Sequence, residues 1–341
     1  MYRLLLPIAL LLASCSSNEG VRRPETTSSL TVAFYNVENL FDTVDDPANP
    51  GDDEFTPAGR LGWTADRLER KLEDLARVIR AMDEYGGVDI LGVSEVETRA
   101  VLARLVAEFL PAGQDSVVHA ESEDERGIDV ALLYRSSAAR VTGQRLHRVD
   151  LGDDRTRQIL HVSFEREGKP FTVLVNHWPS RSGGQTESEP KRIAAARTAV
   201  RIIDSLYALD AAADIILLGD LNDEPGDRSI VETLGARGFA AGAFDARMIN
   251  LAAPVVAADT IGSYLYRGEW ETIDQIMLSR GALDERGLVM IEESQTIFTP
   301  EFLRDEKADR VHRPAYRTYR GPQYIGGVSD HFPVLVRVGW R

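Results

Sequence analysis

Short apolar runs rich in β-branched residues alternate with longer amphipathic segments from Leu30 to the end of the chain. Runs of strand length separated by segments of helix length are typical of α/β domains. Several runs come in pairs without a helix between them, which favours two packed sheets with helices outside. Neither a composition break nor an internal repeat interrupts the pattern. We therefore expect one domain over residues 30–341.

The pattern predicts individual elements. Strands are expected at residues 30–36, 88–93, 128–134, 159–164, 171–176, 214–218 and 333–338. Helices are expected from an N-cap at Thr64 to Met82, from Val101 to Phe109, and from a first turn at Pro190 to about Leu209. The acidic stretch 42–62 lacks the regular spacing of a calcium loop, so a solvated loop is expected there.

The N-terminus is typical of an exported bacterial lipoprotein. A single positive charge at Arg3 precedes an apolar run, residues 4–13, that is too short to span a bilayer as a helix. The run ends in Leu-Ala-Ser-Cys, which resembles a lipobox, and Cys15 is the only cysteine in the chain. We expect a signal peptide at residues 1–14, lipid attachment at Cys15 and a flexible tether over residues 15–29. An ordinary signal peptide that happens to contain a cysteine is the alternative.

The formal net charge of −15 restricts the partners of the chain. Such a surface repels phosphate backbones, so tight nucleic-acid binding by the protein alone is disfavoured. A nuclease is still compatible with this charge, because a bound divalent cation can supply positive charge locally.

Polar residues able to bind a metal follow several predicted strands. They are Asn36, Glu95, Asp220, Asn222 and Asp330. One Asp or Asn after a strand is usually a turn former, but recurrence at separate strand ends favours a site at one rim of the sheets. Carboxylate and amide oxygens suit Mg²⁺ or Mn²⁺.

Two short sequence motifs are harder to explain by a purely structural role. Gly-Asp-Leu-Asn-Asp-Glu-Pro at residues 219–225 follows a buried strand, and Ser-Asp-His-Phe-Pro-Val at 329–334 places an acid beside His331 just before another strand. With five further segments in order, at residues 34–39, 92–97, 127–134, 176–181 and 272–274, they resemble the endonuclease/exonuclease/phosphatase family. That family includes pancreatic deoxyribonuclease, abasic-site endonucleases, bacterial sphingomyelinases and inositol polyphosphate phosphatases.

The resemblance implies a single-domain, four-layer α/β/β/α sandwich in which two mixed sheets pack face to face with the site at one rim. It implies that Glu95 is the main ligand of Mg²⁺ or Mn²⁺, helped by Asn36 and Asp330. It also implies catalytic roles for His177, Asp220, Asn222, Asp274 and His331. In these roles Asp274 orients His331 on the scissile phosphate, Asp220 positions or deprotonates water, and Asn222 holds the water or the phosphate.

Four further residues have two interpretations each. Asp129 either orients His177 or is a strand-edge residue, and Arg157 either clamps phosphate or forms a surface ion pair with its charged neighbours. Trp178 and Arg181 either line the substrate cleft or pack at its rim.

The function expected is hydrolysis of phosphodiester bonds by an extracytoplasmic, nuclease-like, Mg²⁺- or Mn²⁺-dependent enzyme. The anchor would hold it to a membrane, in the periplasm, at the outer membrane or at the cell surface, and no obligate protein partner is expected. A phospholipid or inositol phosphate phosphoesterase of the same fold is the first alternative. A non-catalytic binding lipoprotein is the second.

Overall fold

The computed structural model describes residues 28–47, 49–82, 87–111, 116–239, 245–258, 261–284 and 286–341. The predicted signal peptide, Cys15 and most of the predicted tether lie outside these residues. Ser28 and Ser29, predicted as the end of the tether, already pair with the last strand, opposite Trp340 and Gly339. No helix in the described part of the chain has the length and apolar character needed to cross a membrane.

The first sheet contains the N- and C-terminal strands. Its order is β14 (Leu288–Met290), β18 (Val334–Trp340), β1 (Ser28–Leu40), β2 (Ile90–Val96), β4 (Asp129–Tyr134) and β3 (Ser116–His119), with β15 (Thr296–Ile297) also paired to β18. The β1–β2 pair is parallel and the other pairs are antiparallel, so the sheet is mixed.

The second sheet is built from the middle of the chain. Its order is β5 (Arg140–His147), β6 (Ile159–Arg166), β7 (Lys169–His177), β8 (Ile215–Asp220), β13 (Asp274–Ser279), β10 (Met248–Asn250) and β9 (Ala236–Arg237). Two small hairpins, β11 (Tyr264–Tyr266) with β12 (Glu269–Glu271) and β16 (Tyr319–Arg320) with β17 (Gln323–Tyr324), stand apart from both sheets. Because β7 and β8 are parallel and β13 is antiparallel to β8, this sheet is mixed too.

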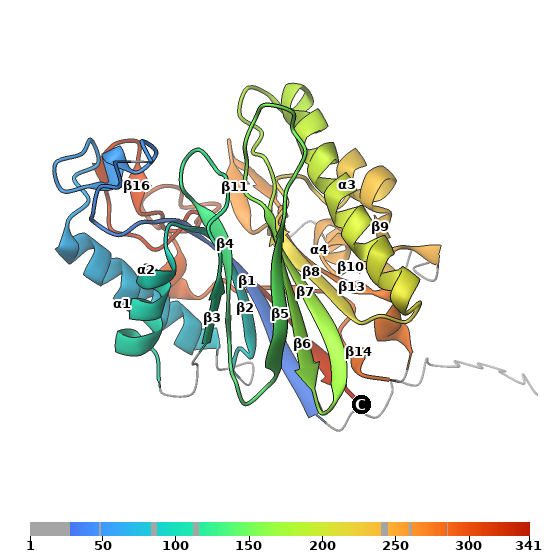
Figure 1. Cartoon of the computed structure of the whole chain (residues 1–341). Helices are drawn as coiled ribbons and strands as arrows, with labels where there is room; N and C mark the ends of the chain where they lie inside the picture. The colour runs from blue at the N-terminus through green and yellow to red at the C-terminus, as the bar shows by residue number, and fades with distance from the viewer. Residues whose placement is uncertain are drawn as a thin grey trace, which may run out of the picture.

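Helices cover the outer face of each sheet (Figure 1). The first sheet is covered by α1 (Ala65–Ala81) and α2 (Arg99–Arg104), the latter continued by a π-helical turn, Leu105–Phe109. The second sheet is covered by α3 (Gln185–Leu209), with a π-helical turn at Ser229–Leu234 beside it. The short helix α4 (Ala253–Ala258) follows β10 in the chain. Short 3₁₀ turns occur at Asp53–Phe55, Arg280–Leu283 and Glu301–Leu303. The predicted four-layer α/β/β/α sandwich is confirmed.

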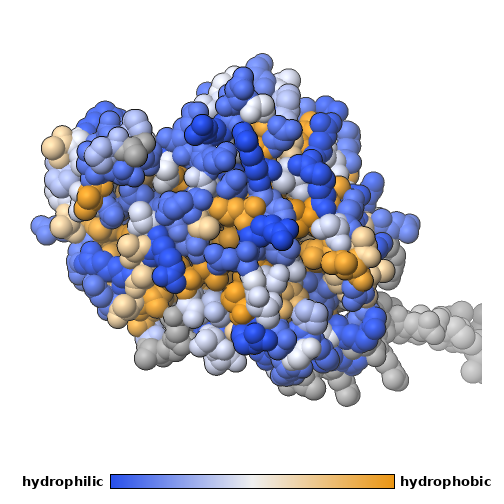
Figure 2. Space-filling model, in the orientation of Figure 1, coloured by the Kyte–Doolittle hydropathy of each residue, from blue (hydrophilic) through white to orange (hydrophobic). Residues whose placement is uncertain are grey.

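The layers are held by three apolar cores. One lies between the two sheets, one beneath α1 and α2, and one beneath α3. The inter-sheet core is closely packed at Gly92 in β2, where an added Cβ would lie 2.3 Å from Leu218 Cδ1 and 3.2 Å from Phe34 Cδ2. The absence of a side chain at this position lets β2 and β8 approach closely. Outside the cores, hydrophilic residues cover most of the face drawn in Figure 2.

Two predictions about local structure are wrong in part. Helix α3 begins at Gln185, so Pro190 lies beyond its first turn. The buried guanidinium of Arg192 holds that turn by donating to Gln185 O (2.9 Å) and to Ser188 Oγ (2.8 Å). The stretch 42–62 is not simply solvated, because Phe55 stacks on Phe41 with ring centroids 4.0 Å apart.

The close approach at Gly92 generates the first prediction. Gly92→Ala should lower the free energy of unfolding by about 1–3 kcal/mol, because the methyl group overlaps Leu218 in a packed core. Urea titrations followed by circular dichroism measure this. Gly143→Ala in β5 is the control, with nothing within 4 Å of the added Cβ, and should change stability by less than about 0.5 kcal/mol. If the overlap is the cause, adding Leu218→Val should recover part of the loss.

The second prediction concerns pH. Burial raises the pKa of Asp214 to about 7, although its carboxylate accepts a hydrogen bond from Leu288 N (2.9 Å). An unfolded aspartate titrates near pH 4, so the unfolded chain releases the proton first and stability falls as pH rises from about 4 to about 7. Asp214→Asn should remove this loss and stabilise the protein at pH 8 by about 1–2 kcal/mol, since solvent still screens the carboxyl.

Urea titrations at pH 4.5 and pH 8 measure the difference. The exposed Asp153→Asn, which makes the same chemical change, should leave the pH dependence of stability unaltered. An equal effect of both variants, or none of Asp214→Asn, would contradict the assignment.

Candidate active site

The predicted site residues come together at one rim of the sandwich. The residues are Asn36 in β1, Glu95 in β2, His177 at the end of β7, Asp220 at the end of β8, Asp274 at the start of β13, and His331 just before β18. The strand register places His177 beside Asp220, and Asp220 beside Asp274, across three neighbouring strands. Their juxtaposition therefore follows directly from the pairing of the second sheet.

Asn36 joins the two sheets at this rim. Its Nδ2 donates to Asp220 Oδ2 (3.0 Å) and lies 3.4 Å from Glu95 Oε1, so one amide contacts a carboxylate from each sheet. The other oxygen of Glu95 accepts a hydrogen bond from Asn39 N (2.9 Å). Both carboxylates are thereby held with their oxygens facing the same space.

Backbone strain is concentrated here. In the described chain seven residues other than glycine have positive φ, and four of them surround the site: Glu38 (48°), Asn39 (54°), Glu95 (64°) and Asn222 (51°). Such conformations cost free energy and persist where the surrounding structure imposes them, which is common at functional sites.

His331 and Asp274 form a buried pair. His331 Nδ1 donates to Asp274 Oδ2 at 2.7 Å, which directs Nε2 toward Asp220 and Asp330, 3.9 Å from a carboxylate oxygen of each. Burial alone would lower the pKa of His331, but the three surrounding carboxylates outweigh it and hold the pKa well above its usual value. These surroundings therefore favour the protonated ring.

The pKa of His177 is shifted in the other direction. Its Nε2 lies 3.7 Å from Asp220 Oδ2 and 4.0 Å from Glu95 Oε1. Burial, then the positive charges of Arg157 and Arg126, lower its pKa well below the usual value, so the ring is neutral. The two histidines thus present one cationic and one neutral imidazole to the same carboxylate.

Asp220 lies between the two rings and is buried. Burial and then the negative charge of Asp274 raise its pKa to about 7, against the opposing effect of His331. Its Oδ1 accepts a hydrogen bond from Asn222 N (3.0 Å), and the side-chain amide of Asn222 donates to Trp178 O (3.0 Å). A carboxyl group that titrates near neutrality suits a general base.

Asp330 is held between an arginine and His331. Its Oδ2 forms an ion pair with Arg317 Nη2 at 2.5 Å, which leaves only Oδ1 facing His331. Beneath it, the buried Lys71 of α1 donates to Glu38 O (2.6 Å) and Thr318 Oγ1 (2.7 Å). Burial raises the pKa of Glu38 to about 7 and lowers that of Lys71 to about 8.

The prediction that Asp129 orients His177 is wrong. Asp129 lies on the same face of β4 as Ala131 and Leu133, which belong to the core beneath α1 and α2, whereas Val130 and Leu132 face the second sheet. Its carboxylate accepts a hydrogen bond from Ser122 N (2.8 Å) and lies 3.2 Å from His119 Nε2. Among the described residues His177 Nδ1 has no hydrogen-bond partner.

The three predicted substrate-binding residues have different positions. Arg157 is buried, paired with Asp124 (3.0 Å) and bonded to Trp178 O (3.0 Å), so it supports the site from behind instead of pairing with its charged neighbours in the sequence. The Trp178 indole packs in the core beneath α3, which favours its packing interpretation. Arg181, bonded to Asn222 O (2.7 Å) and Glu271 (2.6 Å), does line a groove beside the site.

Tyr264, Arg317 and Lys71 were not predicted from the sequence. The Tyr264 ring stacks on His331 with centroids 4.7 Å apart, and it carries no motif that would have identified it. Lys71 had a signal, because it falls in the apolar stripe of its helix between Leu68 and Leu75. A lysine in a buried stripe needs a charge partner.

The oxygens around Glu95 fit a Mg²⁺ or Mn²⁺ ion. These cations bind through one or two carboxylates and keep several waters, and the Glu95 side chain is still 14% exposed. Asn36 Oδ1 accepts from Glu38 N (3.0 Å) but has a second lone pair. A second arrangement able to bind a metal, Asp220 with Asp274 and His331, lies directly beside it.

Comparisons with known proteins agree with this geometry. A family model described as Endonuclease/Exonuclease/phosphatase family matches residues 31–339. No curated relative matches the chain.

Solved structures with the same fold cover nearly the whole chain. A family protein from Bacteroides thetaiotaomicron is 18% identical, with a TM-score of 0.56 over 93% of this chain and 97% of that one. Truncated TDP2 from Caenorhabditis elegans is 14% identical, with a TM-score of 0.55 over 92% and 98%. The mannosyl-6-phosphatase Bt3783 of Bacteroides thetaiotaomicron is 17% identical, with a TM-score of 0.54 over 91% and 100%.

At these identities the structural likeness establishes the fold alone, whereas the family model spans almost the entire described chain. This chain belongs to the endonuclease/exonuclease/phosphatase family.

Proposed function

We propose that the chain is a Mg²⁺- or Mn²⁺-dependent phosphodiesterase of nuclease-like type. Family membership and the site support phosphoester hydrolysis. The dependence on Mg²⁺ or Mn²⁺ and the preference for diesters are proposed in addition. One arrangement carries it: His331 and His177 face the same buried carboxylate, Asp220. Their surroundings shift the two histidine pKa values in opposite directions, and burial raises the pKa of Asp220 to about 7. Such separated protonation states within one site are the arrangement that acid–base chemistry requires.

The residues divide the chemistry between them. Asp220 accepts a proton from the attacking water as the water oxygen bonds to phosphorus. The bond from phosphorus to the ester oxygen breaks in the same displacement, and the departing alkoxide takes up a proton from solvent. The His331 cation, fixed by Asp274, donates a hydrogen bond to a phosphoryl oxygen and stabilises the charge that develops there. A cation bound at Glu95 would add Lewis-acid stabilisation of the phosphoryl group.

A groove beside the site supports an extended substrate. It has a volume of about 880 Å³ and is lined by residues 180–185, Asn222, Tyr264, Tyr266, Arg267, Glu269, Glu271 and Ile273. The rings of Tyr264 and Tyr266 are stacked with centroids 6.4 Å apart, and Tyr264 also stacks on His331. Aromatic faces next to the reacting position suit a nucleotide base or a sugar on the far side of the scissile bond.

A phospholipid or inositol phosphate ester is the second candidate substrate. The net charge of −15 and the proposed lipid anchor at Cys15 favour a small or membrane-borne substrate over a long polyanion. Export and anchoring are part of the proposal and rest on the N-terminal sequence. A structural relative named as a mannosyl-6-phosphatase further supports a range of phosphoesters on this fold.

The catalytic assignment generates the third prediction. Glu95→Gln and His331→Gln should each lower kcat by at least about 10²–10⁴-fold, because each removes a charge used in the transition state. Initial rates on bis-p-nitrophenyl phosphate with Mg²⁺ measure the loss, and unchanged circular dichroism spectra show that folding is intact. Glu167→Gln is a matched control, since this exposed glutamate also has positive φ (52°) but lies in the β6–β7 turn. Near-normal turnover in either site variant would refute the assignment.

The substrate is tested by the fourth prediction. Purified protein should hydrolyse DNA or RNA faster than it hydrolyses sphingomyelin in vesicles, inositol polyphosphates or mannose 6-phosphate. EDTA should abolish the activity, and Mg²⁺ or Mn²⁺ should restore it. Preference for a lipid or inositol phosphate would support the second candidate. Absence of hydrolysis in every case, together with no Mg²⁺ or Mn²⁺ binding by calorimetry, would support a non-catalytic binding protein.

A further inference from the structure

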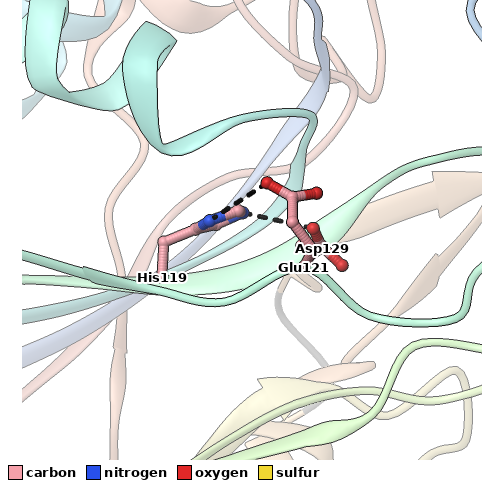
Figure 3. A group of neighbouring side chains, drawn as sticks. All are labelled: His119, Glu121 and Asp129. Carbon is pink, nitrogen blue, oxygen red and sulfur yellow. Dashed lines mark ion pairs between the residues drawn. The ribbon is translucent and has the colours of Figure 1, made fainter. Parts of the chain in front are cut away.

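A histidine and two acids gather on the outer face of the first sheet, near the end of β4 where Asp129 pairs with Val96 of β2. His119 ends β3 and lies opposite Ala131 in β4. Continuing this antiparallel register places Glu121 opposite Asp129, so two carboxylates face each other just beyond the last paired residues. Figure 3 shows the His119 ring directed toward both acids.

This cluster is separate from the catalytic residues. Asp129 projects to the α-helical side of the sheet, as described above. Val118 in β3 faces the second sheet, so its neighbour His119 projects to the same outer side as Asp129. Neither side chain contacts Glu95, His177 or Asp220 in the described part of the chain.

The ring nitrogens of His119 face one acid each. Nε2 lies 3.2 Å from Asp129 Oδ2, and Nδ1 lies 3.7 Å from Glu121 Oε1. One atom from each residue can be chosen so that all three lie within 4.8 Å of one another. Two ligands that bind the same ion at about 2.0–2.2 Å are separated by roughly 3 Å, so the Nε2–Oδ2 distance fits shared coordination.

Burial strengthens this interpretation. The side chains of His119 and Asp129 are only 2% and 4% exposed, and among the described residues His119 Nε2 has no hydrogen-bond partner. A buried ring nitrogen without a partner is costly unless something else binds it. Two carboxylates held this close repel each other when both are ionised.

A simple His119–Asp129 ion pair is the competing explanation. That pair, with Nε2 and Oδ2 3.2 Å apart, offers a single imidazole to two facing carboxylates. Within the described residues neither Glu121 nor Asp129 pairs with a lysine or arginine.

We propose that His119, Glu121 and Asp129 bind a divalent transition-metal ion, Zn²⁺ or Mn²⁺. An imidazole with two carboxylates suits these ions better than Ca²⁺ or Mg²⁺, which prefer oxygen ligands alone. Glu121, with its side chain 70% exposed, closes over the ion from the solvent side, and the remaining positions take water.

The ion would fix the connection between β3 and β4, residues 120–128. Asp124 in this segment pairs with Arg157, and Arg126 donates to Asn39 Oδ1 (2.8 Å) and lies 3.9 Å from Glu95 Oε2. A metal tie at its two ends would therefore hold one wall of the catalytic site in place. The proposed role of this ion is structural, so its binding can be measured without an assay of enzyme activity.

Metal binding is tested in the Glu95→Gln background, where loss of this glutamate weakens the catalytic site and keeps the result independent of the proposed function. Metal-free full-length protein is titrated with Zn²⁺ and, separately, Mn²⁺ by calorimetry, and bound metal is counted by mass spectrometry after dialysis. We expect one equivalent of bound metal. His119→Gln should weaken the metal affinity by at least about 10–100-fold, because even the loss of a residue that only supports a metal ligand has an effect of this size. Glu121→Gln should weaken it too and, being exposed, does not disturb packing.

His147→Gln is the matched control. His147 and His161 form a second histidine pair on β5 and β6, with ring nitrogens 3.2 Å apart, and losing His147 should leave the affinity unchanged. No bound ion in the Glu95→Gln background would overturn the proposal. Binding that survives both His119→Gln and Glu121→Gln, or that is lost with His147→Gln, would overturn it as well.

Discussion

The close packing of the two sheets at Gly92 is the constraint on which the catalytic site depends. Glu95 belongs to one sheet and Asp220 to the other, and the amide of Asn36 reaches both carboxylates only because the sheets lie this close. A side chain at position 92 would push β2 away from β8 three residues before Glu95. The core and the site are thus parts of one arrangement, since the packing that excludes water also sets the distance between the carboxylates of Glu95 and Asp220.

Because the site is buried, the charged neighbours of each histidine have a large effect on its pKa. His331 and His177 are both buried beside Asp220, yet three carboxylates raise the pKa of the first, whereas burial and the charges of Arg157 and Arg126 lower the pKa of the second. In water, screening would largely erase this difference. The buried position preserves it, so the neutral and the cationic ring follow from residues that never need to touch the substrate. Arg157 contributes in this way, through its charge and through its hydrogen bond to Trp178 O.

The sequence predicted two packed sheets and several polar residues at one rim from local patterns. The four-layer order and the roles of His177 and Asp274 followed from the resemblance to the family. Apolar runs mark buried strands, and polar residues at their ends collect at one edge. It could not predict which way Asp129 points, because the run 128–134 is apolar on both faces and lacks the alternation that would identify its outward side. Arg157 pairs with Asp124 across thirty-three positions of sequence, a contact that only the tertiary fold creates. Lys71 was predictable in principle, from its place in the apolar stripe of α1.

The excess of acidic residues is handled differently at different places in the fold. Near the catalytic rim the chain supplies its own cations: Lys71 lies beneath Glu38, and Arg317 pairs with Asp330. On the outer face of β3 and β4 the described residues provide only the imidazole of His119 for two facing carboxylates. A buried imidazole is a weak countercharge when neutral and an excellent ligand in that same state. The same physical problem, negative charge removed from water, therefore calls for an internal lysine or arginine at one place and for a metal ion at the other.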